Sequence, residues 1–87
     1  MNTNTKDLFP ITMAATACGV SRSTLMRLEE KGLLTPVYTA PDSGRRYYDN
    51  HNVSRILQIQ RFQTMGFSTA EIYDYYASNG DAEKNLT

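Results

Sequence analysis

The apolar positions of the chain first follow a helical spacing, in two short segments separated by a glycine. The first segment, predicted over residues 12–18, opens with Thr12, a residue type that favours helix N-caps. Gly19 ends this segment, because glycine takes the positive φ of a helix C-terminus without strain. Ser21 is a second N-cap signal, and it predicts a helix over residues 22–31 whose leucines share one face.

Together the two segments match the spacing of a helix-turn-helix unit over residues 11–31. Such a unit needs a small residue in its first helix and a glycine in its turn, and the chain has Ala15 and Gly19 there. The remaining contact positions hold Ala14, Cys18, Val20, Leu25 and Leu28. We expect that a bulky side chain at position 15, or a β-carbon at position 19, would push the two helices apart.

The helical spacing gives way to strand-forming residues between positions 36 and 49. Residues 37–40 include valine, tyrosine and threonine, which favour strands, and residues 45–48 predict the returning strand. The connection over residues 41–44 is the turn sequence Pro-Asp-Ser-Gly. An isolated hairpin is marginally stable, so this predicted wing must lie against the helices.

Two more helices are predicted after the wing. The third helix covers about residues 51–64, and either Asp49 or Asn50 caps it. Its buried stripe is expected to consist of Val53, Ile56, Leu57 and Phe62. The fourth helix covers residues 69–78, because the preceding Ser-x-x-Glu sequence is a capping box. Its inward-facing residues are expected to be Ile72, Tyr75 and Tyr76, and it stops at Asn79 and Gly80.

The length of 87 residues suits one small domain. We predict that this domain spans residues 11–79 and is mostly α with a small β-hairpin, a winged helix-turn-helix fold with four helices. Its helix-turn-helix covers about residues 11–31 and its wing about residues 36–49. Residues 1–10 are predicted to form a flexible N-terminal tail, and residues 80–87 a second tail.

The composition argues against catalysis. The single cysteine, Cys18, allows no intramolecular disulfide and no cysteine-rich zinc site, and His51 is the lone histidine. The sequence contains no Gly-rich phosphate loop and no nucleophile elbow. We therefore predict no enzyme, no cofactor and no metal. The unpaired thiol, the polar start and the lack of about 18 consecutive apolar residues favour a cytoplasmic protein without membrane contact.

The charge is unevenly distributed, although nine basic and nine acidic residues cancel over the whole chain. Residues 20–63 hold seven basic and four acidic groups, a net charge of +3, and residues 64–87 hold one basic and four acidic groups, a net charge of −3. The basic part contains the second helix and the wing, and a local basic surface binds phosphates whatever the total charge. An ordinary solvated surface explains the same distribution equally well.

The second helix is the expected reader of double-stranded DNA. Its N-terminal N–H groups attract phosphate, and Arg22 or Arg27 could reach guanine edges, although Arg27 could instead pair with Glu30. In the wing, strand alternation turns one arginine and one tyrosine outward, where both groups can bind phosphate oxygens. The candidate DNA-binding residues are Ser21, Arg22, Ser23, Thr24, Arg27, Tyr38, Arg45, Arg46, Tyr47 and Tyr48.

The order of these motifs resembles the DNA-binding domain of MerR-type transcription regulators over about residues 11–78. The motifs are Ile11-Thr12, Gly19-Val20-Ser21, Glu29 with Gly32-Leu33-Leu34, the wing from Pro41 to Tyr48, Met65-Gly66-Phe67-Ser68 and Glu71-Ile72. The wing is most similar to that of the multidrug-sensing branch. The resemblance implies that residues 21–24 and Arg27 enter the major groove, and that Arg46 with Tyr47 or Tyr48 holds the backbone. It also implies that full-length homodimers bind an inverted repeat in a promoter with an overlong spacer, and distort it so that RNA polymerase engages both promoter elements.

The chain departs from this family at several positions. Met26-Arg27-Leu28 stands where many relatives have Arg-Tyr-Tyr or Arg-Phe-Tyr, and Gln63 stands where a basic residue is common. The residues after position 79 lack the apolar stripe of the family's long dimerisation helix. We therefore expect either an excised domain or a stand-alone variant, and a monomer is compatible with both.

Two other functions remain open on the sequence. Excisionases share this fold and size, bend DNA by cooperative binding to adjacent sites, and sense no effector. A winged helix can also bind protein, and Tyr73, Tyr75 and Tyr76 could form that surface, although a dimerisation helix could equally cover it. The operator, the regulated genes, the effector and the choice between activation and repression are not encoded in any recognisable motif.

Overall fold

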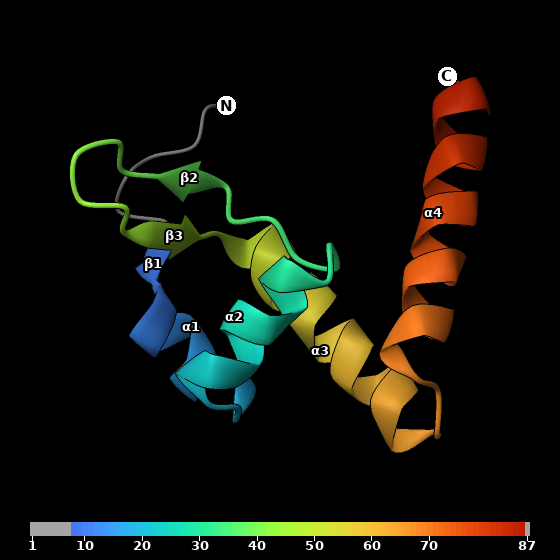
Figure 1. Ribbon diagram of the computed structural model, residues 1–87, viewed down its shortest axis with the longest axis horizontal. Helices are drawn as coiled ribbons and strands as arrows, with labels where there is room; N and C mark the ends of the chain where they lie inside the picture. The colour runs from blue at the N-terminus through green and yellow to red at the C-terminus, as the bar shows by residue number, and fades with distance from the viewer. Residues whose placement is uncertain (1–7, 87) are drawn as a thin grey trace.

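The computed structural model describes residues 8–86, which form four helices and a small sheet. The sheet lies at one end of the molecule (Figure 1). The helices are α1 (Ile11–Cys18), α2 (Arg22–Glu30), α3 (Asn50–Thr64) and α4 (Thr69–Leu86). The strands are β1 (Phe9–Pro10), β2 (Tyr38–Thr39) and β3 (Arg46–Tyr48). The predicted fold class, a mostly α winged helix-turn-helix with four helices, is confirmed.

The sheet is antiparallel and has the strand order β1-β3-β2, so it contains one strand more than the predicted hairpin. The added strand β1 pairs Phe9 with Tyr48 of β3. The prediction of a flexible tail is therefore wrong for Phe9 and Pro10, while residues 1–7 lie outside the described part of the chain. A strand of two residues has too short a pattern to be recognised without its distant partner.

The turn between α1 and α2 follows its local capping signals. Gly19 is the C-cap of α1, and the predicted N-cap Ser21 accepts a hydrogen bond through Oγ from the Thr24 N–H at 3.1 Å. The predicted start of α1 at Thr12 is wrong, because Pro10 is its N-cap and makes no side-chain cap bond. Proline is tolerated there because the N–H that it lacks would have no helical partner.

Gly19 is required for its backbone conformation rather than for close helix packing. A β-carbon added at this residue would meet no heavy atom within 4 Å, so the expectation that it would push the helices apart is wrong. The φ of +72° lies in the left-handed region, which L side chains rarely adopt. Ala15 is 4% exposed, as the predicted need for a small residue at this helix contact requires.

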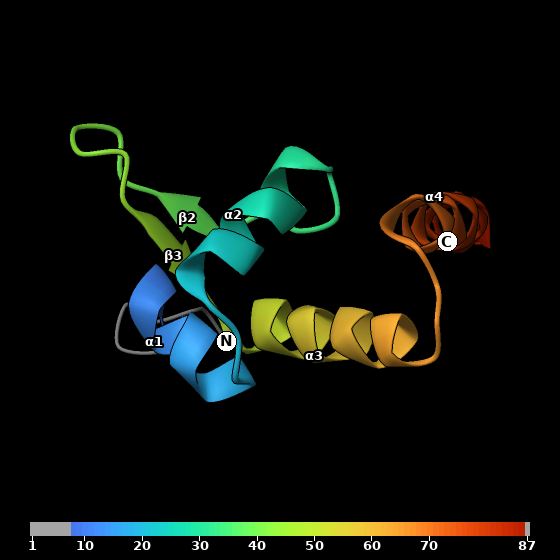
Figure 2. The same ribbon diagram turned by 60° about the horizontal axis from the view of Figure 1, so that its bottom comes forward.

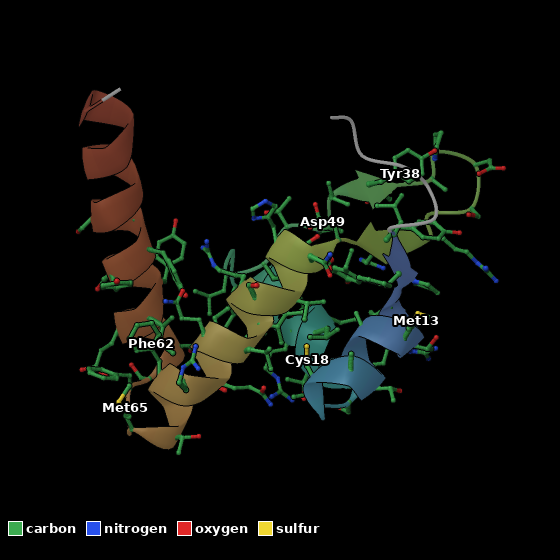
Figure 3. The ribbon with its side chains drawn as sticks, turned by 180° about the vertical axis from the view of Figure 1, so that it is seen from behind. Met13, Cys18, Tyr38, Asp49, Phe62 and Met65 are labelled. Atoms are coloured by element: carbon green, nitrogen blue, oxygen red, sulfur yellow. The ribbon has the colours of Figure 1, made fainter. Side chains whose placement is uncertain are left out.

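One hydrophobic cluster joins the helices to β3. Its largest fully buried side chains are Tyr48, Leu25, Leu33, Ile56, Ile59 and Ile72. The predicted burial of Leu57 is wrong, since Leu57 is 40% exposed and Ile59 is buried in its place. Ile56 and Ile59 are three residues apart and therefore share a helix face. Figure 3 shows Cys18 directed from α1 into this region, whereas Met13 lies on the outer side of α1.

An aromatic cluster joins α4 to the end of α3. The capping box is confirmed: Ser68 Oγ accepts from the Glu71 N–H at 3.1 Å, and Glu71 Oε1 accepts from the Ser68 N–H at 2.9 Å. Phe62 lies between the two helices in Figure 3, and its ring centroid is 5.1 Å from that of Tyr75 and 6.2 Å from that of Tyr76. Tyr75 therefore faces Phe62 as predicted, but it remains 45% exposed and is not part of the buried core.

The helix α4 is longer than predicted and extends away from the rest of the domain (Figure 1). Asn79 and Gly80 do not end it, and the predicted C-terminal tail is helical through Leu86. Residue 87 lies outside the described part. An interior glycine costs a helix about 1 kcal/mol relative to alanine, which weakens the helix without terminating it. Among the described helices, none combines the length and apolar character needed to cross a membrane.

Candidate nucleic-acid interface

The helix α2 and the wing hairpin lie on the same side of the molecule, above α1 and α3 in the view of Figure 2. A cleft of about 450 Å³ separates them. Arg22 and Met26 of α2 form one wall, and the wing contributes Ser43, Gly44, Arg45 and Arg46 to the other. Three arginines around one cleft make it electropositive, which suits the binding of an anionic group.

The N-terminal turn of α2 is open to solvent. Ser21, Arg22 and Ser23 are exposed, and the first turn contains no acidic residue. The Ser21 Oγ and the Thr24 Oγ1 lie 2.9 Å apart and hydrogen bond to each other, so these hydroxyls are already engaged within the helix. The free backbone N–H groups and the positive end of the helix dipole are therefore the main anion-binding features of this turn.

Arg27 is exposed on α2 and shares a helix face with Ser23, four residues before it. The alternative expectation was an ion pair between Arg27 and Glu30. Among the side chains of residues 8–78, the salt bridge that the structure contains joins Arg46 to Glu29 instead. The guanidinium of Arg27 therefore remains available at the surface.

Strand alternation sorts the tyrosines of the wing onto two faces. Tyr47 pairs with Tyr38 across the hairpin, with ring centroids 5.9 Å apart, and Tyr38 is 48% exposed. Figure 3 shows Tyr38 at the sheet, away from the helices. The next residue, Tyr48, is 0% exposed. Its inclusion among the candidate DNA contacts is wrong, because its side chain packs in the core and offers no surface to a partner.

The two arginines of the wing likewise differ in exposure, one side chain pointing outward and the other inward. Arg45 is exposed beside Gly44, whose φ of +74° allows the tight turn at the tip. Arg46 turns inward, and its Nε donates a hydrogen bond to Glu29 Oε1 at 2.6 Å. The Glu29 carboxylate raises the pKa of Arg46. Arg46 is therefore held by the protein at Nε and does not project freely from the wing.

Glu29 is the residue that sequence reasoning did not assign to this region. Its second oxygen, Oε2, accepts a hydrogen bond from the Tyr48 hydroxyl at 2.5 Å. Burial, reinforced by this hydrogen bond to Glu29, raises the pKa of Tyr48 well above the usual value for tyrosine. No local signal marks the contact, because Glu29 and Tyr48 are separated by 19 residues and belong to different elements.

The structure thus brings some of the predicted DNA-binding residues together at one site. The cleft brings together Arg22, Arg45 and Arg46. Outside its lining lie the N-cap Ser21, then Ser23, Thr24 and Arg27 on α2, and Tyr38 and Tyr47 on the sheet. The described side chains include no cluster of three or more His, Cys, Asp or Glu residues that could hold a metal. Burial raises the pKa of the Cys18 thiol, which keeps it in its unreactive neutral form.

Comparison with known proteins gives a consistent result. A family model described as MerR HTH family regulatory protein matches residues 9–79. The chain is similar to the crystal structure of a MerR family transcriptional regulator from Bacillus cereus, with 27% identity and a TM-score of 0.72 over 80% of this chain and 52% of the other.

A second solved structure has a similar fold. It is HiNmlR, a MerR family regulator lacking the sensor domain, bound to promoter DNA, with 22% identity and a TM-score of 0.74 over 83% of this chain and 54% of the other. The chain therefore spans about half the length of the two solved structures. Comparison with curated proteins found no match.

Proposed function

Because the chain belongs to the MerR family of helix-turn-helix regulatory proteins, we propose that it binds double-stranded DNA sequence-specifically and regulates transcription. The observation that carries the proposal is the electropositive cleft between α2 and the wing, with three arginines around it. The presence of promoter DNA in the HiNmlR structure supports the same class of partner.

In this proposal α2 enters the major groove with its N-terminal turn leading. The backbone N–H groups at the start of α2, before the capped Thr24, bind a phosphate and set the position of the helix. Arg22 and Arg27 reach base edges, where a guanidinium pairs with the two acceptors of guanine. Ser23 is exposed beside them and is the hydroxyl of this turn free to join the contact.

The wing holds the DNA backbone. Arg45, exposed at the tip, binds phosphate oxygens, and the hydroxyls of Tyr38 and Tyr47 donate to further oxygens on the outer face of the sheet. These contacts release counterions from DNA, so the affinity falls as the salt concentration rises. The wing therefore contributes affinity and register, and α2 contributes sequence preference.

We further propose that the full-length protein acts in the cytoplasm as a homodimer on an inverted repeat within a promoter. The distorted promoter would then be engaged by RNA polymerase, as the family resemblance implies. In this scheme the energy of deforming the DNA is part of the regulation.

The test is the selection of binding sites by the 87-residue chain from a random duplex library at low salt. Enrichment of two inverted half-sites is the expected result. Enrichment of single sites or direct repeats would fit a monomeric isolated domain or the excisionase-like function instead of a dimer on an inverted repeat. If binding were only salt-sensitive and without sequence preference, the proposed reading role of α2 would be rejected.

A further inference from the structure

One carboxylate connects the proposed reading helix to the wing. Glu29, at the C-terminal end of α2, accepts one hydrogen bond from Arg46 Nε at 2.6 Å and one from the Tyr48 hydroxyl at 2.5 Å. Arg46 and Tyr48 alternate with Tyr47 along β3, so their side chains leave the same face of the strand. Among the described residues, these are the hydrogen bonds that link α2 to the sheet.

The position of Glu29 is unfavourable for α2 taken alone. A negative charge at the C-terminal end of a helix lies beside the negative end of the helix dipole. The Glu29 side chain is also only 13% exposed, so its charge is largely removed from water. Arg46 and the buried Tyr48 hydroxyl offset both costs by pairing with the two carboxylate oxygens. The carboxylate therefore serves the contact with the wing rather than the helix.

The same contact fixes the direction of the Arg46 guanidinium. Glu29 holds Nε, and within the described chain the two terminal nitrogens have no hydrogen-bond partner. The Arg46 side chain is 39% exposed and lines the cleft beside Arg22 and Arg45. Because the guanidinium is planar and offers several donors, a terminal nitrogen can bind a phosphate in the cleft while Nε stays on Glu29.

We propose that Glu29 is a positioning residue for DNA binding, which sets the separation of α2 and the wing and presents Arg46 to one backbone phosphate. This inference rests on the proposed function. If the charge of Glu29 mattered only through repulsion, removing this negative group beside DNA would strengthen binding. The positioning role predicts the opposite change, a weaker affinity for the specific site, because the contact with the wing is lost.

The test compares Glu29→Gln with Glu30→Gln, an exposed neighbour that undergoes the same change of charge. The Kd is measured on the selected site and on a random duplex across a salt series, and circular dichroism reports whether each variant is folded. We expect Glu29→Gln to lose roughly tenfold in specific affinity and about one unit of salt slope, because one phosphate contact is lost. Glu30→Gln should bind as tightly as the wild type or more tightly.

A second variant covers the case in which Glu29→Gln does not fold. Arg46→Lys keeps the charge, but a single ammonium cannot hold Glu29 and a phosphate with the same fixed geometry, so a comparable loss of specific affinity is expected. If folded Glu29→Gln, or folded Arg46→Lys where Glu29→Gln does not fold, matched the wild type in both affinity and salt slope, the positioning role of Glu29 would be overturned. The proposal of DNA binding would still stand. A wild-type chain without preference for any duplex would instead reject the proposed function itself.

Discussion

Replacing Gly19 by alanine separates two reasons for a glycine in the turn between α1 and α2. The structure places this residue at a φ of +72°, and an added β-carbon would meet no heavy atom within 4 Å. Steric pressure between the helices therefore contributes nothing, and the cost of a side chain is the cost of the left-handed backbone. The variant pair Gly19→Ala and Gly19→Asn isolates that cost, because asparagine tolerates this conformation better than alanine does.

The expected magnitude follows from the backbone alone. A left-handed conformation costs an ordinary L residue about 1–2 kcal/mol, so Gly19→Ala should lower the free energy of unfolding by this amount. Gly19→Asn should lose less than about 1 kcal/mol. Urea unfolding followed by far-UV circular dichroism measures both values, and each kcal/mol should lower the Tm of a domain of this size by about 4–8 °C.

A different result would refute this reasoning. Equal losses for both variants, each above about 3 kcal/mol, would mean that the β-carbon itself meets its surroundings. The turn would then be a close helix contact, as the sequence pattern alone suggests. Both folded variants should retain DNA binding well below their Tm, because no proposed DNA contact is removed.

Three further predictions concern the core, the pH dependence and the interface. Ile59→Ala should cost about 2–5 kcal/mol of unfolding free energy and Leu57→Ala only about 0.5 kcal/mol, and the reverse order in urea unfolding would contradict the observed helix face. Burial raises the pKa of Tyr48, so its contribution to stability is complete below about pH 10 and is lost as the pH rises further. The Tm should therefore fall between about pH 8 and 11, and Tyr48→Phe should reduce this fall. An identical fall of the Tm in that variant would exclude Tyr48 as its source. Arg45→Ala should weaken binding to all duplexes and lower the salt slope by about one, whereas Arg27→Ala should relax one base position at about 1–3 kcal/mol; an exchange of these two profiles would reverse the assigned roles.

The helix starts were predictable wherever a side chain caps its own helix. Ser21 caps α2, Asp49 caps α3 in a reciprocal arrangement with Asn52, and the Ser-x-x-Glu sequence caps α4. Each of these bonds spans three residues, so the sequence holds both partners together. The start of α1 lacks a side-chain cap bond, and there the predicted boundary was wrong.

The buried face of α3 was only partly predictable. Val53, Ile56, Leu57 and Phe62 all fall within a plausible apolar stripe, but the helix presents Ile56 and Ile59 to the core and leaves Leu57 exposed. Helical periodicity predicts which side of the helix is buried only to within about one residue in each turn. The direction from which the neighbouring elements approach decides which of the adjacent apolar residues is buried. The length of α4 was likewise missed, because a turn-favouring pair such as Asn-Gly weakens a helix without ending it.

The order and type of the main elements, the helix-turn-helix and the presence of a wing follow from the sequence alone. Capping, turn chemistry and periodicity depend on residues a few positions apart, so a short stretch of sequence contains all the residues that take part. The pairing of Phe9 and Pro10 with the sheet, and the contact of Glu29 with Arg46 across 17 residues, arise only when the elements pack together. Such contacts depend on which surfaces meet after the helices pack, and no local pattern of residues specifies that meeting.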